Sequence, residues 1–161
     1  MNTTDEIQHV LDVSRFAVMA TQQKGQPHAS LMAFIPMSGI HYLIIATYRT
    51  TLKYSNLSKD GRVAVLINNY IATGPSKYRD LVITAHGIAT EVTDDDRDRV
   101  KQAYLTRHPE FNDFLASSDC ALLRVVVSTY EVVGGTEDVQ WHPVGDGNKS
   151  RPLSINDPKN F

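Results

Sequence analysis

Stretches in which apolar and polar residues alternate, or in which β-branched residues run together, cover most of this chain. Six of them have the length and pattern of β-strands, at residues 16–21, 29–35, 41–47, 62–68, 81–92 and 120–133. Gly87 interrupts the fifth and predicts a bulge or a sharp bend. The first three are joined by turns too short for parallel crossovers, so the pattern predicts antiparallel pairing.

Helical periodicity is confined to the N-terminus and to the connections between strands. The first helix carries Ile7, Val10, Leu11 and Ser14 on one face. Thr3 or Thr4 is its expected N-cap, because a hydroxyl there satisfies a free backbone N–H. A short helix is expected after the third strand, a longer one from residues 93–96 to His108, and a last short one within residues 110–119.

This order of elements predicts a mainly β fold, a split β-barrel of about six antiparallel strands with flanking helices. We expect one domain over residues 1–145, because a chain of 161 residues is long enough for one core. Residues 69–79 are expected to form a loop, and residues 146–161 a polar C-terminal tail.

Composition and charge remove several classes of function. The net charge of -2 and the pI near 6.3 give no electrostatic basis for binding nucleic acid or an acidic membrane. Cys120 is the only cysteine and opens an apolar strand, so we expect a packed thiol and no disulfide or cysteine metal site. The polar N-terminus is unlike a signal peptide, and no apolar run approaches the ~20 residues of a membrane span, which favours a cytoplasmic protein.

The segment ATYRTTLKYSNL, residues 46–57, carries the most specific chemistry. It follows an apolar strand and starts a short helix with Arg49, Thr50, Thr51 and Lys53 near its beginning. The N-terminus of a helix is partially positive, so two cations there are unfavourable unless an anion lies among them. Phosphate is the natural anion for such a site. The alternative is that Thr50 or Thr51 only caps the helix while the cations face water.

Three segments, ATQQKGQPHAS, LIIATYRTTLKYSNL and RVAVLI, occur here in the order and setting of a known family. With the helix before them, they resemble the FMN-binding split barrels related to pyridoxamine 5'-phosphate oxidase, over most of residues 5–133. The resemblance implies a homodimer with FMN held in a cleft between the subunits. It also places the phosphate: Thr51 and Lys53 would hold it with Arg49 as a further contact, and Thr47 and Tyr48 would lie at the ribityl–phosphate end.

The same resemblance implies where the flavin ring lies. The backbone of Ser30, Leu31 and Met32 would run along the isoalloxazine ring, and Asn68 and Asn69 would lie near the ring or its partner-subunit edge. A flat apolar ring needs an apolar slot and a few backbone hydrogen bonds, which such a strand can supply.

Trp141 is the only tryptophan, and two roles are open for it. It stacks on the flavin from the partner subunit, or it plugs the end of the barrel.

Two departures separate the chain from the oxidase itself. Leu52 precedes Lys53, where the oxidase pattern has an arginine, and the tail lacks the oxidase's arginine–leucine–histidine stretch that reads the substrate. We therefore expect a flavin site without the pyridoxal phosphate site, and not a vitamin B6 oxidase.

Histidines and a second resemblance offer weaker alternatives. None of the six histidines forms a helical pair or clusters with carboxylates, so no metal site is expected. His86 is the best placed to face a cleft, or else it is a hydrogen-bonded strand residue. Residues 107–110 and 133–135 are similar to split barrels of the haem-utilisation type, without that family's aromatic–glycine continuation.

The resulting hypothesis is an FMN-dependent oxidoreductase that is reduced by a nicotinamide nucleotide and acts on a small acceptor. The flavin would carry the redox chemistry, and the protein would bind and orient it. Two alternatives remain: a non-catalytic FMN-binding or storage protein, and a split barrel whose ligand is a deazaflavin or haem.

Overall fold

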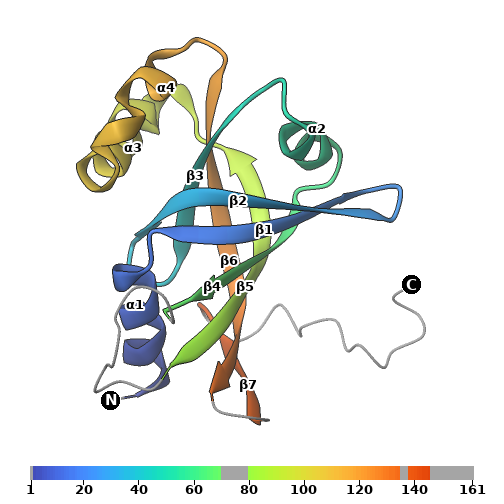
Figure 1. Ribbon diagram of the computed structural model, residues 1–161, viewed down its shortest axis with the longest axis vertical. Coiled ribbons are helices and arrows are strands. Elements are labelled where there is room, and N and C mark those ends of the chain that lie inside the picture. The colour runs from blue at the N-terminus through green and yellow to red at the C-terminus, as the bar shows by residue number, and fades with distance from the viewer. Residues whose placement is uncertain (1, 70–79, 135–137, 146–161) are drawn as a thin grey trace.

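A computed structural model describes residues 2–69, 80–134 and 138–145 (Figure 1). The first half of the chain contains α1 (Thr3–Val13), β1 (Phe16–Gln23), β2 (Gln26–Met37), β3 (Tyr42–Tyr48), α2 (Leu52–Lys59) and β4 (Arg62–Asn68). The second half contains β5 (Leu81–Glu91), α3 (Asp94–Arg107), η1 (Pro109–Phe111), α4 (Asn112–Ala116), β6 (Cys120–Gly134) and β7 (Asp138–Pro143). Parts of the predicted loop and the whole predicted tail lie outside the described residues.

Six antiparallel strands close into a barrel, as the sequence predicts. The strand order is β3-β2-β1-β4-β5-β6, and β3 also pairs with β6 along residues 42–48, which joins the two edges. A seventh strand, β7, pairs with residues 129–134 of β6, beyond the segment of β6 that pairs with β3. The hydrophobic pattern does not predict β7, because its described apolar side chains, Val139 and Trp141, are both exposed and give no alternation of buried and exposed positions.

Two hydrophobic cores explain why some strands alternate and others are apolar throughout. The larger core fills the barrel with residues such as Phe34, Leu43 and Val65, and α1 and α2 add side chains to it. The smaller core lies on the other face of β2 and β3, where Ile35 and Ile44 pack under α3 and α4. Because residues 32–35 of β2 and 43–45 of β3 are buried on both faces, these parts of the sequence read as continuous apolar runs.

The β1–β2 hairpin and the bulge in β5 follow from local backbone chemistry. Lys24 and Gly25 both have positive φ, 51° and 76°, as the two central residues of a tight hairpin turn require. The ladder runs to the pair Gln23–Gln26, so both strands continue past the predicted apolar segments. The register shifts between His86 and Gly87, which confirms the predicted bulge.

The start of α1 differs from the prediction. Its N-cap is Asn2, whose Oδ1 accepts a hydrogen bond from the Asp5 N–H at 2.9 Å, while the Asp5 carboxylate accepts from the Asn2 N–H. This reciprocal capping box satisfies two backbone donors at once, which Thr3 or Thr4 alone would not do. Ser14, predicted on the inner face of the helix, is buried but is its C-cap.

Candidate functional site

The turn between β3 and α2 brings two predicted site residues, Thr47 and Thr51, to one place. Thr51 is the N-cap of α2, one of the two predicted candidates, and its hydroxyl accepts from the Tyr54 N–H at 3.4 Å. The hydroxyl oxygens of Thr47 and Thr51 lie 2.8 Å apart. Thr47 is buried at the end of β3, so the barrel fixes this pair of hydroxyls beside the first turn of the helix.

A cleft of about 280 Å³ opens at this turn and runs between strands and helices. It brings together six of the predicted residues: Leu31, Met32, Thr47, Tyr48, Thr51 and Lys53. The other lining residues are Phe16, Ala33, Ala46, Tyr104, Phe111 and Phe114. One end of the cleft is therefore polar and cationic, and the rest is apolar, as a phosphate joined to a flat ring requires.

Lys53 is the cation of the cleft. Its side chain is partly buried, and no carboxylate in the described part of the chain forms an ion pair with it. The N-terminal end of α2 adds its own partial positive charge. Hydroxyl groups, a helix N-terminus and an ammonium group together suit an oxyanion such as phosphate.

Aromatic rings from the second half of the chain form one wall of the cleft. Tyr48 packs against Phe114 with ring centroids 4.4 Å apart, Phe111 lies 6.0 Å from Phe114, and Tyr104 lies 6.2 Å from Phe111. Tyr104, Phe111 and Phe114 lie within two of the expected helices, but their sequence pattern gives no indication that they reach the site. Helical periodicity shows that a residue faces inward, but not which strand it meets.

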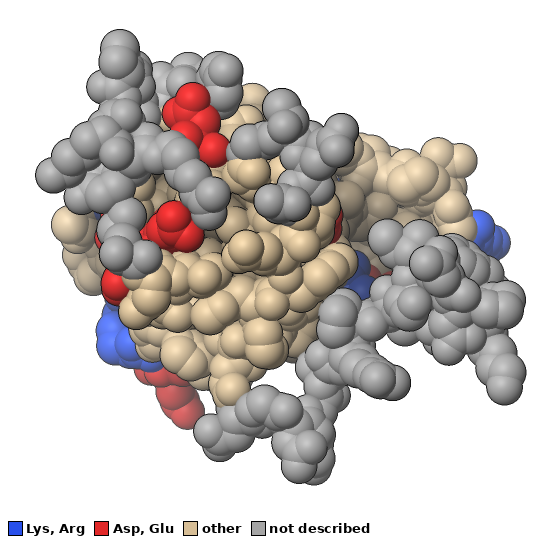
Figure 2. Space-filling model, turned by 90° about the horizontal axis from the view of Figure 1, so that it is seen from below, with Lys and Arg blue, Asp and Glu red and all other residues tan. Residues whose placement is uncertain are grey.

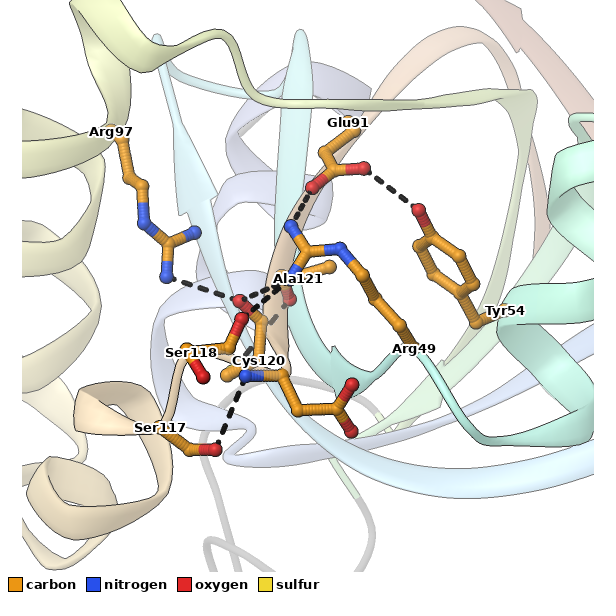
Figure 3. Close-up of polar contacts among 9 residues, drawn as sticks. Arg49, Tyr54, Glu91, Arg97, Ser117, Ser118, Cys120 and Ala121 are labelled. Atoms are coloured by element: carbon orange, nitrogen blue, oxygen red, sulfur yellow. Dashed lines mark hydrogen bonds and ion pairs between the residues drawn. The ribbon is translucent and has the colours of Figure 1, made fainter.

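Arg49 and Thr50 do not line the cleft. Figure 3 shows the Arg49 side chain directed toward Glu91 and toward residues 118–120. The Arg49 guanidinium forms an ion pair with Glu91 and donates to the carbonyl oxygen of Ser118 at 3.0 Å. The hydrogen bond to Glu91 raises the pKa of Arg49. The Thr50 hydroxyl lies 3.4 Å from the carboxylate of Asp119. Both residues are engaged with the barrel, in contrast to the phosphate contacts that the sequence suggests for them.

Ser30 and Asn69, which the resemblance places near the ring, do not line the cleft. The Ser30 hydroxyl lies 3.3 Å from His28 Nδ1. Asn69 is fully buried, and its Oδ1 accepts a hydrogen bond from the Leu81 N–H at 3.0 Å. These contacts give Asn69 a structural role at the end of β4.

Asn68 and Trp141 lie outside the cleft as well. Asn68 lines a neighbouring hollow of about 510 Å³, which shares Phe16 and Leu31 with the cleft. Trp141 is 41% exposed on β7, 5.4 Å from the His86 ring. Its stacking on a flavin from a partner subunit stays a prediction.

The histidines of residues 86 and 108 have structural partners. His108, in the segment similar to haem-utilisation proteins, is completely buried, and its Nε2 lies 2.8 Å from the Phe34 carbonyl oxygen. Next to it, Arg107 donates to carbonyl oxygens at the end of α1 and so holds that helix. The Nε2 of His86 lies 3.5 Å from a Glu131 carboxylate oxygen.

Two further features limit the chemistry of the described residues. No group of three histidine, cysteine or carboxylate side chains among them is arranged to hold a metal ion. Cys120 is fully buried and its burial raises the pKa of the thiol, which gives the packed cysteine that the sequence predicts.

Charge is dispersed over the face shown in Figure 2. On the face shown in Figure 2, lysines and arginines occur in separate small groups and form no single basic patch among the residues described there. None of the helices in the described part of the chain is long and apolar enough to cross a membrane.

Comparison with known proteins gives the family. The profile of the family "Pyridoxamine 5'-phosphate oxidase" matches residues 3–133, which is more than half of the chain. No curated protein sequence matches the chain.

Solved structures share the fold at low sequence identity. A haem-binding protein from Mycobacterium smegmatis superposes with a TM-score of 0.76 at 18% identity, covering 89% of this chain and 58% of that protein. Atu2129 from Agrobacterium tumefaciens, of unknown function, gives a TM-score of 0.71 at 21% identity over 83% of this chain and 57% of that protein. An FAD-binding protein from Mesorhizobium loti gives 0.68 at 13% identity over 84% and 96%. The chain thus spans less than two thirds of the first two proteins.

Proposed function

Because the chain belongs to the pyridoxamine 5'-phosphate oxidase family, we propose that its cleft binds FMN and that the protein is an FMN-dependent oxidoreductase acting on a small acceptor.

The observation that carries this proposal is the position of Lys53 beside Thr47 and Thr51 at the polar end of an otherwise apolar cleft. The phosphate of FMN carries a charge of about -1.5 to -2, which suits this set of donors. The ring would lie along Leu31 and Met32, against the aromatic wall. Arg49, Thr50 and Asn69 are left out of the proposed contacts, because they do not line the cleft.

The same residues favour a flavin over haem. Iron in haem is most often held by histidine or cysteine, and neither residue is among the described residues that line the cleft. His108, in the segment similar to haem-utilisation proteins, is buried with its Nε2 bonded to the backbone. A helix N-terminus with an adjacent lysine suits the phosphate of a flavin nucleotide.

When bound, FMN would accept a hydride from a nicotinamide nucleotide and pass the electrons to the acceptor. The chain itself would hold the phosphate at Lys53 and cover the ring with apolar side chains. Burial raises the pKa of Tyr104, whose hydroxyl donates to the Ala33 carbonyl oxygen, so this phenol stays protonated. No carboxylate or histidine lines the described cleft, so we assign the protons of the reaction to solvent.

We further propose a homodimer with FMN at the subunit interface. Leu31 is 72% exposed and Phe16 is 50% exposed, and both line the cleft and the neighbouring hollow. Val18 pairs with Leu31 on one side and with Leu66 on the other, so these apolar side chains form a row across three strands. A second copy of the chain over this row would bury it and close the cleft.

Pyridoxamine phosphate is not the proposed substrate. Leu52 stands where the oxidase pattern has an arginine, and its apolar side chain is 54% exposed. The tail also lacks the oxidase's arginine–leucine–histidine stretch that reads the substrate. We therefore propose a small acceptor without a phosphate group.

An anaerobic reduction experiment tests the activity. The protein is saturated with FMN, and NADH or NADPH is added while the flavin absorbance is followed. We expect the absorbance to bleach faster than that of free FMN and to return when an acceptor is added. Binding of FMN without faster bleaching would favour the storage alternative, and failure to bind FMN would contradict the proposal as a whole.

A further inference from the structure

One carboxylate joins the two sides of the turn that carries the proposed phosphate site. Arg49 is the first residue of the turn between β3 and α2, and Tyr54 lies in the first turn of α2, next to Lys53. The Arg49 guanidinium pairs with one oxygen of Glu91, and the Tyr54 hydroxyl donates to the other at 2.9 Å. Figure 3 shows both side chains converging on Glu91, which ends β5. The carboxylate therefore bridges the residues before and after Thr51 and Lys53.

Arg49 also attaches the turn to the start of β6. Its Nη1 donates to the carbonyl oxygens of Ser118 at 3.0 Å and Cys120 at 3.3 Å, and its backbone N–H donates to the Asp119 carbonyl oxygen at 3.0 Å. Arg97 from α3 donates to the same Cys120 oxygen at 3.1 Å. A guanidinium is a rigid, planar group, so contacts in several directions fix its position more firmly than one ion pair would.

The need for such an attachment comes from the size of α2. The helix has eight residues, and a helix this short is not stable in isolation. Its first turn must nevertheless hold Lys53 and the backbone N–H groups in a fixed geometry for a phosphate to be bound tightly. Binding sites reach such geometry when a supporting layer of residues locks the residues that touch the ligand.

We propose that Glu91, acting through Arg49 and Tyr54, is a positioning residue for the phosphate end of the cleft, an inference that rests on the FMN function proposed above. Glu91 touches no ligand in this scheme. It holds the 49–51 turn and the start of α2 against the barrel, and it neutralises Arg49, so that Lys53 is the cation presented to the phosphate. The expected signature is a loss of discrimination between FMN and riboflavin, which lacks the phosphate.

The first test compares FMN and riboflavin affinities by fluorescence titration of full-length variants. Glu91→Ala should weaken FMN binding about tenfold and leave riboflavin binding nearly unchanged, as loss of a charge-assisted attachment predicts. Glu91→Gln, which keeps a hydrogen-bonding group in place, should retain most of the discrimination. Tyr54→Phe removes one hydroxyl, is well tolerated sterically, and should cause a smaller loss in the same direction.

A matched control and a second substitution separate positioning from other roles. Arg62→Ala breaks the ion pair with Asp60 at the opposite end of α2 and should leave both affinities unchanged. Arg49→Lys keeps the charge, but a lysine cannot reach Glu91 and two carbonyl oxygens together. This variant should therefore lose the discrimination between FMN and riboflavin, and Arg49→Ala should lose it to the same extent.

Three results would overturn the inference. Unchanged discrimination in Glu91→Ala would show that the attachment is not needed. Tighter FMN binding in that variant would show that Glu91 acts only by repelling the phosphate. If Arg49→Lys kept the full discrimination between FMN and riboflavin, Arg49 would act by a direct charge contact with the phosphate instead. If the unaltered protein binds FMN no better than riboflavin, the proposed function itself fails, and this inference fails with it.

Discussion

Among single residues, Lys53 matters most to the proposed recognition of phosphate. It lines the cleft, and no carboxylate of the described residues neutralises it. Charge-assisted hydrogen bonds contribute about 1.5–3 kcal/mol each. We therefore expect Lys53→Ala to weaken FMN binding by about ten- to a hundredfold, with little change for riboflavin.

Lys59→Ala is the matched control for that titration, because Lys59 is exposed in the last turn of the same helix. It should bind FMN as the unaltered protein does. Equal FMN affinities for Lys53→Ala and Lys59→Ala would contradict the assignment of Lys53 to the phosphate site.

Residues 49–53 show which side-chain positions local sequence can predict and which it cannot. A threonine cap, Thr50 or Thr51, followed by Lys53 can be predicted from the spacing, since these positions are fixed by the helix that they begin. The direction of the Arg49 side chain is set by Glu91, a residue 42 positions away. Thr50 likewise contacts Asp119, 69 positions away. A single sequence carries no signal for such pairings, which is why both residues were expected at the phosphate.

At the scale of elements, the bulge in β5 is the feature whose loss should cost most. A Cβ added to Gly87 would lie 2.2 Å from the carbonyl oxygen of Val126, so the β5–β6 ladder would have to open. We expect Gly87→Ala to lower the free energy of unfolding by about 3 kcal/mol, as severe overpacking does. Urea denaturation followed by circular dichroism measures this.

Gly25→Ala provides the comparison. Gly25 has a positive φ of 76°, but no atom lies within 4 Å of an added Cβ. The cost is then that of a left-handed backbone alone, about 1–2 kcal/mol. If both alanine variants unfold at the same urea concentration, close packing at the bulge is not what requires glycine.

The elements themselves were largely predictable, and the exceptions have physical reasons. The strands of the barrel bury one or both faces, so their hydrophobic patterns are strong. The pattern for β7 is absent, because this strand is held by backbone pairing to β6 and leaves Trp141 exposed. The aromatic wall of α3, η1 and α4 could not be assigned to the cleft, because that assignment depends on which outer face of the barrel the helices cover.

For the whole molecule, the central expectation is a dimer formed through the apolar row of β2, β1 and β4. Leu66 is 41% exposed in this row and does not line the cleft. Leu66→Asp should place a charge in the buried interface and shift the protein from dimer to monomer in sedimentation velocity at micromolar concentration. FMN affinity should fall with the dimer, since the partner closes the cleft.

Ile88→Asp is the control for dimerisation. Ile88 is 47% exposed on β5 and lines neither the cleft nor the neighbouring hollow. The Ile88→Asp variant should remain a dimer. A monomeric unaltered protein that still binds FMN tightly would contradict the shared cleft.

The most direct test of the account is the absorbance spectrum of the freshly purified protein, with mass analysis of the ligand that heating releases. We predict a flavin spectrum and the mass of FMN, at about one molecule per chain. A haem spectrum, or a colourless protein that takes up no added FMN, would contradict the claim that Lys53 and its neighbouring hydroxyls form a flavin phosphate site.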